Sequence, residues 1–142
     1  MSKKLKYILQ DIGREMTLSD RMRIVKPVDM DEKIWQLVIT LNLKGIVTAG
    51  SCDGHYLTPG ATQLFPWVSL EPDWALRSQH EVMRLKEALA NYNLRHPVQW
   101  DVVPHSPDET NFYGFVHPTT VTDLRILQAS IPSVTEHLEI NL

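Results

Sequence analysis

Two short apolar runs, joined by a long connection rich in glycine, proline and threonine, constrain the fold of this chain most. Residues 45–51 read GIVTAGS and residues 66–70 read PWVSL. Both runs contain β-branched or aromatic residues, and each is too short for a buried helix. The pattern predicts strands at Ile46–Ser51 and Pro66–Leu70. If they pair as neighbours, the connection at residues 52–65 is much longer than an ordinary hairpin loop.

A helix is predicted directly before the first run. Apolar residues recur at helical spacing over Asp31–Leu43. Asp29 and Glu32 have the spacing of a capping box at its start, and Gly45 supplies a stop. A second helix is predicted over residues 78–93 and opens with a capping box at Ser78 and Glu81. Strands are predicted at Val98–Val103 and Phe112–Val116. They are followed by a helix that opens at Thr119 or Thr120 and ends before Pro132, and by an edge strand in the tail at residues 137–142.

This element order predicts an α+β protein. Helix, strand, strand, helix, strand, strand, helix is typical of a two-layer sandwich in which helices pack on a mostly antiparallel sheet of about four strands. A competing arrangement makes helix 78–93 a right-handed crossover between the second and third strands, which are then parallel neighbours. A chain of 142 residues, 43% of them hydrophobic, fits a single domain at residues 1–142.

Charge is distributed unevenly along the chain. Residues 1–26 carry seven Lys/Arg and three Asp/Glu, a net charge of +4, and the remainder carries −7. We expect the basic segment at residues 1–28 to lie across the acidic body; alternatively, Arg21 and Arg23 meet an anionic ligand. A net charge of −3 without a basic stripe argues against duplex nucleic acid as a partner, because phosphate neutralisation supplies most non-specific affinity.

The chain is expected to be cytoplasmic and to have no membrane partner. No apolar run approaches the ~20 residues that cross a bilayer, and polar residues interrupt what a secretion signal would need to keep apolar. Cys52 is the single cysteine, so an intramolecular disulfide is excluded, which suits a reducing compartment. The sequence leaves the oligomeric state open, a homo-oligomer included.

The turn after the first strand has residues that could carry chemistry. Gly54 allows a tight bend that brings the Cys52 thiol and the His55 imidazole together, and a nearby imidazolium or backbone amide activates a thiol. His105, in the connection at residues 105–111, serves as an acid or base if the two loops are adjacent. Cys52, His55 and His105 are therefore the candidate catalytic residues. The alternative is that Cys52 is a small buried hydrophobe beside an ordinary turn.

Zinc binding is another interpretation of these residues. Cys52 and His55 could reach one ion from a common turn, with His105 and His117 as remote ligands. However, one cysteine and scattered histidines lack the close paired spacing of a zinc signature. We expect no metal and no cofactor. Neither a Walker nor a dinucleotide-binding glycine pattern is present, so a nucleotide is only one candidate ligand.

The connection at residues 52–65 favours ligand binding as the leading hypothesis. Its hydroxyl, amide and backbone N–H groups suit a small polar or anionic ligand, including a nucleotide-like one, and Tyr56, Phe65 and Trp67 offer flat surfaces to a planar group. A Cys/His-dependent enzyme and a protein-interaction module without a small-molecule site are the alternatives. The candidate ligand-binding residues are Arg21, Arg23, Asp53, Gly54, Tyr56, Thr58, Thr62, Gln63 and Trp67.

LNLKGIVTAGSCDGH followed by PWVSLEP resembles a scattered group of uncharacterised bacterial and phage proteins with a Ser-Cys-x-Gly-His element. The resemblance covers about a quarter of the chain and implies a shared site at the Cys-His loop, but no activity comes with it. Ser51, Cys52 and Gly54 alone are similar to the tRNA wybutosine-synthesis methyltransferase family. That family has arginine in place of His55 and a basic RNA-facing surface, so its activity is not expected here. The positions that match the first group are Leu41, Asn42, Gly45, Ile46, Thr48, Ser51, Cys52, Gly54, His55, Pro66, Trp67 and Val68.

Overall fold

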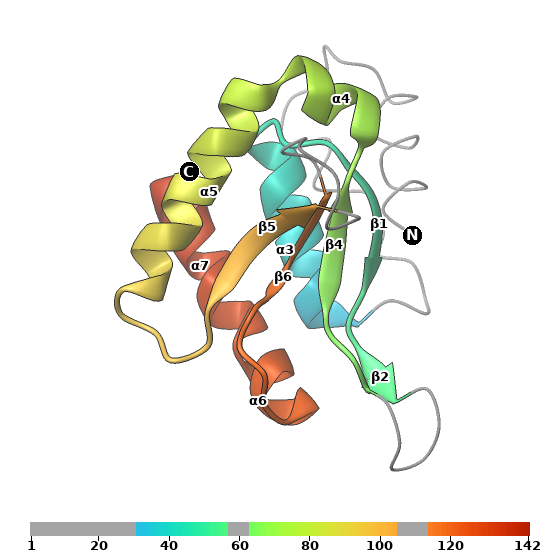
Figure 1. Ribbon diagram of the computed structural model, residues 1–142, viewed down its shortest axis with the longest axis vertical. Helices are drawn as coiled ribbons and strands as arrows, with labels where there is room; N and C mark the ends of the chain where they lie inside the picture. Colours follow the sequence, from blue (N-terminus) through green and yellow to red (C-terminus); the bar gives the residue numbers. More distant parts are fainter. Residues whose placement is uncertain (1–30, 57–62, 105–113) are drawn as a thin grey trace.

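The computed structural model describes residues 31–56, 63–104 and 114–142. Its centre is a four-stranded sheet with the strand order β1-β4-β6-β5, in which every neighbouring pair is antiparallel (Figure 1). A two-stranded ladder of β2 and β3 prolongs the β1–β4 hairpin beyond this sheet. The strands are β1 (Thr48–Cys52), β2 (His55–Tyr56), β3 (Gln63–Leu64), β4 (Trp67–Leu70), β5 (Trp100–Pro104) and β6 (Gly114–Pro118).

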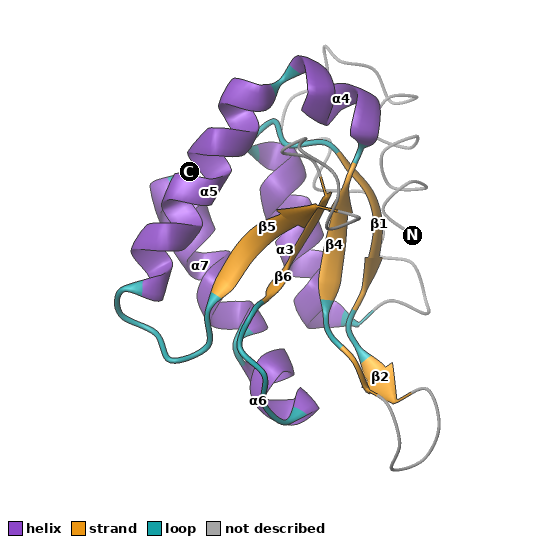
Figure 2. Cartoon of the chain, viewed as in Figure 1, coloured by secondary structure: helices purple, strands orange, loops and turns teal. Residues whose placement is uncertain are grey.

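Helices pack on one face of the sheet. α7 contacts both α3 and α5; in Figure 2, α5 and α7 lie to the left of the strands and α3 lies behind them. The predicted α+β class, with helices packed on an antiparallel sheet, is confirmed. The helices are α3 (Glu32–Leu43), α4 (Pro72–Arg77), α5 (Gln79–Asn93), α6 (Leu124–Ala129) and α7 (Ile131–Asn141).

The hydrophobic core lies between the sheet and the helix layer. Val68, Trp100 and Val116 are fully buried, and along each strand such positions alternate with partly buried ones. The buried faces of α3, α5 and α7 belong to the same hydrophobic cluster. Four residues at helical spacing on α5 are all buried: Val82, Leu85, Leu89 and Tyr92.

The connection from β4 through α5 to β5 differs from the competing arrangement, in which helix 78–93 joins two parallel neighbouring strands. β4 and β5 are each antiparallel to β6, so they run parallel to each other, as that arrangement requires. However, β6 lies between them, and the prediction of parallel neighbours is therefore wrong. The result is a split βαβ unit, in which the two parallel strands leave room for a third.

The ends of α3 illustrate how local sequence sets helix boundaries. The Asp31 side chain accepts a hydrogen bond from the Lys33 N–H at 2.8 Å, so Asp31 is the N-cap. The helix thus begins later than the capping box predicted from Asp29. Gly45 has a φ of 85° and closes a Schellman motif, which confirms the predicted stop.

Two other predicted helix starts have different outcomes. α5 begins where predicted, with Ser78 as its N-cap and also as the C-cap of α4, but the Ser78 side chain makes no capping hydrogen bond, so the predicted capping box does not form. α6 begins after Asp123, whose side chain caps it, and not at Thr119 or Thr120. The Thr120 hydroxyl instead accepts a hydrogen bond from the Gln99 N–H at 2.8 Å and so holds the residue directly before β5 in place. β6 also extends further than predicted, to Pro118.

The C-terminal tail is helical, so the edge strand predicted at residues 137–142 is wrong. Ile131, Val134 and Leu138 recur at helical spacing and are buried in the layer that α7 forms with α3 and α5. Pro132 lies in the first turn of α7, where no intrahelical N–H bond is required. Pro132 therefore marks the beginning of a helix as well as the end of the preceding one.

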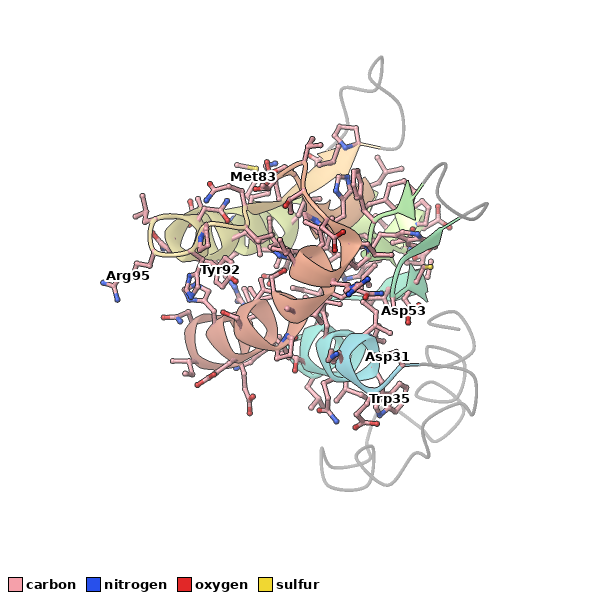
Figure 3. All side chains as sticks on the ribbon, turned by 90° about the horizontal axis from the view of Figure 1, so that it is seen from below. Asp31, Trp35, Asp53, Met83, Tyr92 and Arg95 are labelled. Carbon is pink, nitrogen blue, oxygen red and sulfur yellow. The ribbon has the colours of Figure 1, made fainter. Side chains whose placement is uncertain are left out.

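A polar cluster joins α5 to α7. Tyr92 lies between the two helices (Figure 3), and its hydroxyl donates a hydrogen bond to the Ser133 Oγ at 3.1 Å. The His96 ring stacks on Tyr92 with a centroid distance of 3.8 Å, and His137 meets the same ring edge on. Burial raises the pKa of Tyr92, and the hydrogen bond to Ser133 partly opposes this rise.

The structure bears only in a limited way on two expectations, the packing of the N-terminal segment and the absence of a membrane span. The basic segment at residues 1–28 lies outside the described residues, so its packing across the body stays a prediction. Over residues 31–56, 63–104 and 114–142, no helix combines the length and apolarity that a membrane span needs.

Candidate functional site

The chain leaves β1 through a tight turn that carries the cysteine. Gly54 has a φ of 89°, a conformation that favours glycine, and its N–H donates a hydrogen bond to the Cys52 sulfur at 3.4 Å. The Cys52 side chain is only partly buried. The predicted bend at Gly54 is therefore confirmed, and the sulfur acts as an acceptor within it.

Strand pairing resumes immediately after this turn. His55 pairs with Leu64 and Tyr56 pairs with Gln63 in the β2–β3 ladder. The connection at residues 52–65 is thus a hairpin extension at both ends and not one open loop. For His55, Tyr56 and Gln63 only the backbone belongs to the described structure, so the expected proximity of the Cys52 thiol and the His55 imidazole stays a prediction.

A glutamine from the C-terminal part of the chain holds the turn in place. The Gln128 side chain on α6 donates hydrogen bonds to the carbonyl oxygens of Asp53 at 3.0 Å and Gly54 at 3.3 Å. One side chain thereby bonds two backbone acceptors of the turn. The position of the Cys52–Gly54 turn consequently depends on α6.

The sheet face opposite the helices carries a cluster of rings. Trp67 on β4 and both Phe115 and His117 on β6 are partly exposed positions that alternate with buried ones. Together with Phe65, which precedes β4, they line a recess of about 410 Å³. We call this space the aromatic recess. It lies where the sheet passes into the β2–β3 ladder.

The rings of the aromatic recess pack against one another. Trp67 and Phe115 meet edge to face, with a centroid distance of 5.3 Å and an interplanar angle of 70°. Phe65 and His117 are nearly parallel, with centroids 6.3 Å apart and planes at 24°. Both arrangements are favourable for rings of this kind, so the walls of the recess are held in place.

Two residues of β1 border the aromatic recess. Cys52 pairs with Trp67 across the β1–β4 ladder, and paired residues of antiparallel strands point to the same face. Gly50 lies beside the indole, and a Cβ at this position would make an ordinary 3.5 Å contact with the Trp67 ring. The thiol-bearing strand position is therefore a direct neighbour of the recess.

Formal charge is sparse around the aromatic recess. The described lining residues include no Lys, Arg, Asp or Glu. Asp101 pairs with His117 across β5 and β6, but its carboxylate accepts a hydrogen bond from the Lys86 Nζ at 2.9 Å. The His117 Nδ1 lies 2.6 Å from the carbonyl oxygen of Pro118. This lining suits a neutral planar group better than an anion.

The residues predicted for the site have different outcomes. Cys52, Asp53 and Gly54 form the turn, and Trp67 lines the aromatic recess beside it. Within the described part of the chain, no three His, Cys, Asp or Glu residues come close enough together to hold a metal ion. For His55, Tyr56 and Gln63 the backbone alone is described. Five further candidates lie outside the described residues: Arg21, Arg23, Thr58, Thr62 and His105.

Sequence reasoning misses two residues of the site and gives one a different role. Phe115 is not among the predicted site residues, although its alternation with buried neighbours in β6 indicates that it faces outward. His117 is expected only as a remote zinc ligand. Gln128 has no signal at all in the sequence, because its contact with the turn depends on how α6 packs.

No known protein-family model, curated protein or solved structure matches this chain. The resemblance to the bacterial and phage group therefore stays a prediction, and the geometry of the aromatic recess is the basis for the functional argument.

Proposed function

We propose that this protein binds a small molecule by taking a planar ring of that molecule into the aromatic recess. The observation that carries the proposal is a concave space of about 410 Å³ lined by Phe65, Trp67, Phe115 and His117. Small-molecule sites usually have volumes of roughly 300–1,000 Å³ and mainly apolar or aromatic linings. Size and lining chemistry both support a ligand of this class.

The physical advantage of such a ligand follows from the partial exposure of the rings. Trp67, Phe115 and His117 each leave part of their surface in water. A planar ring that enters the recess removes this surface from water and adds stacking or edge-to-face contacts, each of which contributes about 0.5–1.5 kcal/mol beyond burial.

This proposal is narrower than a general site for polar or anionic ligands. The described lining has no cationic side chain that would attract an anion. Arg21 and Arg23, the residues expected to meet an anionic group, lie outside the described residues and carry no part of the proposal. A neutral ring is the ligand that the recess supports best.

Binding can be tested with 6-methoxyquinoline, a planar two-ring probe. The full chain, labelled with ¹⁵N, is titrated while NMR follows the Trp67 indole N–H and the Phe115 amide. We expect saturable shifts of both signals, and Trp67→Ala and Phe115→Ala should each weaken binding by about tenfold, the effect of roughly 1.4 kcal/mol.

Val103→Ala is the matched control for this experiment. Val103 pairs with Phe115, so it lies on the same face of the sheet, but it does not line the aromatic recess. Its affinity for the probe should equal that of the unaltered chain. A probe that shifts neither signal, or that binds Trp67→Ala as tightly as the unaltered chain, contradicts the proposal.

A second candidate function is thiol chemistry on the bound molecule. It is favoured by the hydrogen bond from the Gly54 N–H to the Cys52 sulfur and by the pairing of Cys52 with Trp67. Because the chain has a single cysteine, iodoacetamide labels one site. The labelling rate is measured as a function of pH. Thiolate-based chemistry requires the midpoint of this pH dependence to lie below the ordinary thiol pKa of about 8.5. A midpoint at or above this value removes this candidate.

A further inference from the structure

The hydrogen bond of His117 to the backbone determines which of its ring nitrogens can accept a hydrogen bond from a ligand. Nδ1 lies 2.6 Å from the carbonyl oxygen of Pro118. A carbonyl oxygen only accepts hydrogen bonds, so Nδ1 must be the donor and carry a proton. In the neutral imidazole Nε2 then has a free lone pair.

Nε2 is the single side-chain acceptor of the described lining. The phenyl rings of Phe65 and Phe115 have no polar atom, and the Trp67 indole N–H is a donor only. No described residue forms a hydrogen bond with Nε2. Within the described structure the acceptor is therefore available to a molecule in the recess, and its ring is oriented by the bond to Pro118 at one edge and by Phe65 alongside.

We propose that His117 is the specificity-determining residue of the aromatic recess, and that it selects planar rings with an N–H or O–H donor on their edge. This inference rests on the proposed function and adds the class of ligand to it. Lactam-type heterocycles and phenols belong to this class, whereas rings without an edge donor do not.

The expected selectivity is moderate. A ring without a donor leaves the Nε2 lone pair against an apolar surface, and an acceptor that loses its water without replacement weakens binding. The recess is open to solvent, so water can satisfy Nε2 in part when such a ring is bound. We expect discrimination of roughly five- to tenfold, the range of a neutral hydrogen bond.

The inference is tested by comparing 6-hydroxyquinoline with 6-methoxyquinoline at pH 7.5, where imidazole is ordinarily neutral. The two probes share their ring system and differ in the edge donor. The readout is the ratio of their affinities, compared between the full chain and its His117→Phe variant. This comparison cancels the difference in hydrophobicity between the probes.

We expect His117→Phe to lower the preference for the hydroxyl probe, measured as the ratio of the two affinities, by roughly five- to tenfold, because the acceptor is lost while a flat ring remains beside Phe65. In His117→Gln the amide oxygen is an acceptor, so part of the preference should return. Val103→Ala should keep the full ratio.

The possible failures can be told apart. If both probes bind and their ratio is the same in the unaltered chain and in His117→Phe, the inference is overturned while the proposed function stands. If His117→Gln regains none of the preference, a hydrogen bond to Nε2 is likewise contradicted. If neither probe binds, the proposed function is wrong and this inference falls with it.

Discussion

The side chain of Gln128 reaches across the fold to the carbonyl oxygen of Asp53 and donates a hydrogen bond to it at 3.0 Å. A second bond from the same nitrogen reaches Gly54. The turn that borders the aromatic recess is thus anchored by a helix that follows the whole sheet in the sequence.

Gln128→Leu should loosen this turn. The substitution keeps much of the side-chain bulk but removes both hydrogen bonds to the turn, which should lower the free energy of unfolding by about 1–2 kcal/mol. Amide hydrogen exchange at Gly54 should become faster, because its N–H bond to Cys52 depends on the turn. Arg125→Ala, an exposed change on the same helix, is the control. Unchanged exchange at Gly54 would show that Gln128 does not position the turn.

Gly114→Ala should disrupt the β5–β6 pair. A Cβ at Gly114 would lie 1.8 Å from the Val103 carbonyl oxygen, so the backbone of one strand has to move. We expect a loss of about 3 kcal/mol or more, measured by urea denaturation. Gly50→Ala provides the comparison, because its Cβ would make an ordinary 3.5 Å contact with the Trp67 ring. Similar losses in the two variants would contradict the explanation.

Asn93→Ala should destabilise the edge of the sheet. The Asn93 side chain bonds both the N–H and the carbonyl oxygen of Trp100, at 2.8 Å each, as a neighbouring strand would. Its loss leaves two backbone groups of a fully buried residue unpaired and should cost about 2–3 kcal/mol. Asn91→Ala on the exposed side of α5 should change stability by less than about 0.5 kcal/mol. Equal stabilities for the two variants would rule out this role.

Tyr92 should make the protein less stable in alkali. Its pKa is raised from the ordinary value of 10.0 by burial. Above pH 10 the unfolded chain therefore releases the phenolic proton while the folded chain still holds it, so the free energy of unfolding falls as the pH rises towards the folded pKa.

Tyr92→Phe should remove this part of the alkaline loss, at a cost of about 1 kcal/mol at neutral pH for the bond to Ser133. Urea denaturation between pH 8 and 11 measures both effects. Ser133→Ala removes the bond but keeps the buried phenol, so it should retain the alkaline fall. An identical pH dependence for Tyr92→Phe and the unaltered chain contradicts the assignment.

Much of the fold could be predicted from local patterns. The apolar stripe of α3, the inward face of α5 and the alternation in β5 each report burial on one side, and that burial is what the structure shows. The wrong predictions of helix boundaries lie where one residue type is compatible with two local structures. Pro132 ends one helix and begins another, and Thr120 is used for a strand connection although it is also a good capping residue.

The site could be predicted only in part, because its walls come from distant strands. Phe65 and Trp67 flank the hairpin connection and stand out in the sequence as flat surfaces near the turn. Phe115 and His117 join them only because β6 pairs with β4, and no local pattern specifies that pairing. The order of strands in a sheet is a property of the whole chain.

The capped edge of the sheet also limits how copies of this protein can associate. Asn93 bonds the backbone of Trp100, and Lys86 bonds the Val102 carbonyl oxygen at 3.0 Å, so these outward groups of β5 are occupied by side chains of the same chain. Fibril growth needs two receptive edges on every subunit. A sheet blocked at one end can be extended only from the other, and strand-to-strand association then stops at a pair of molecules.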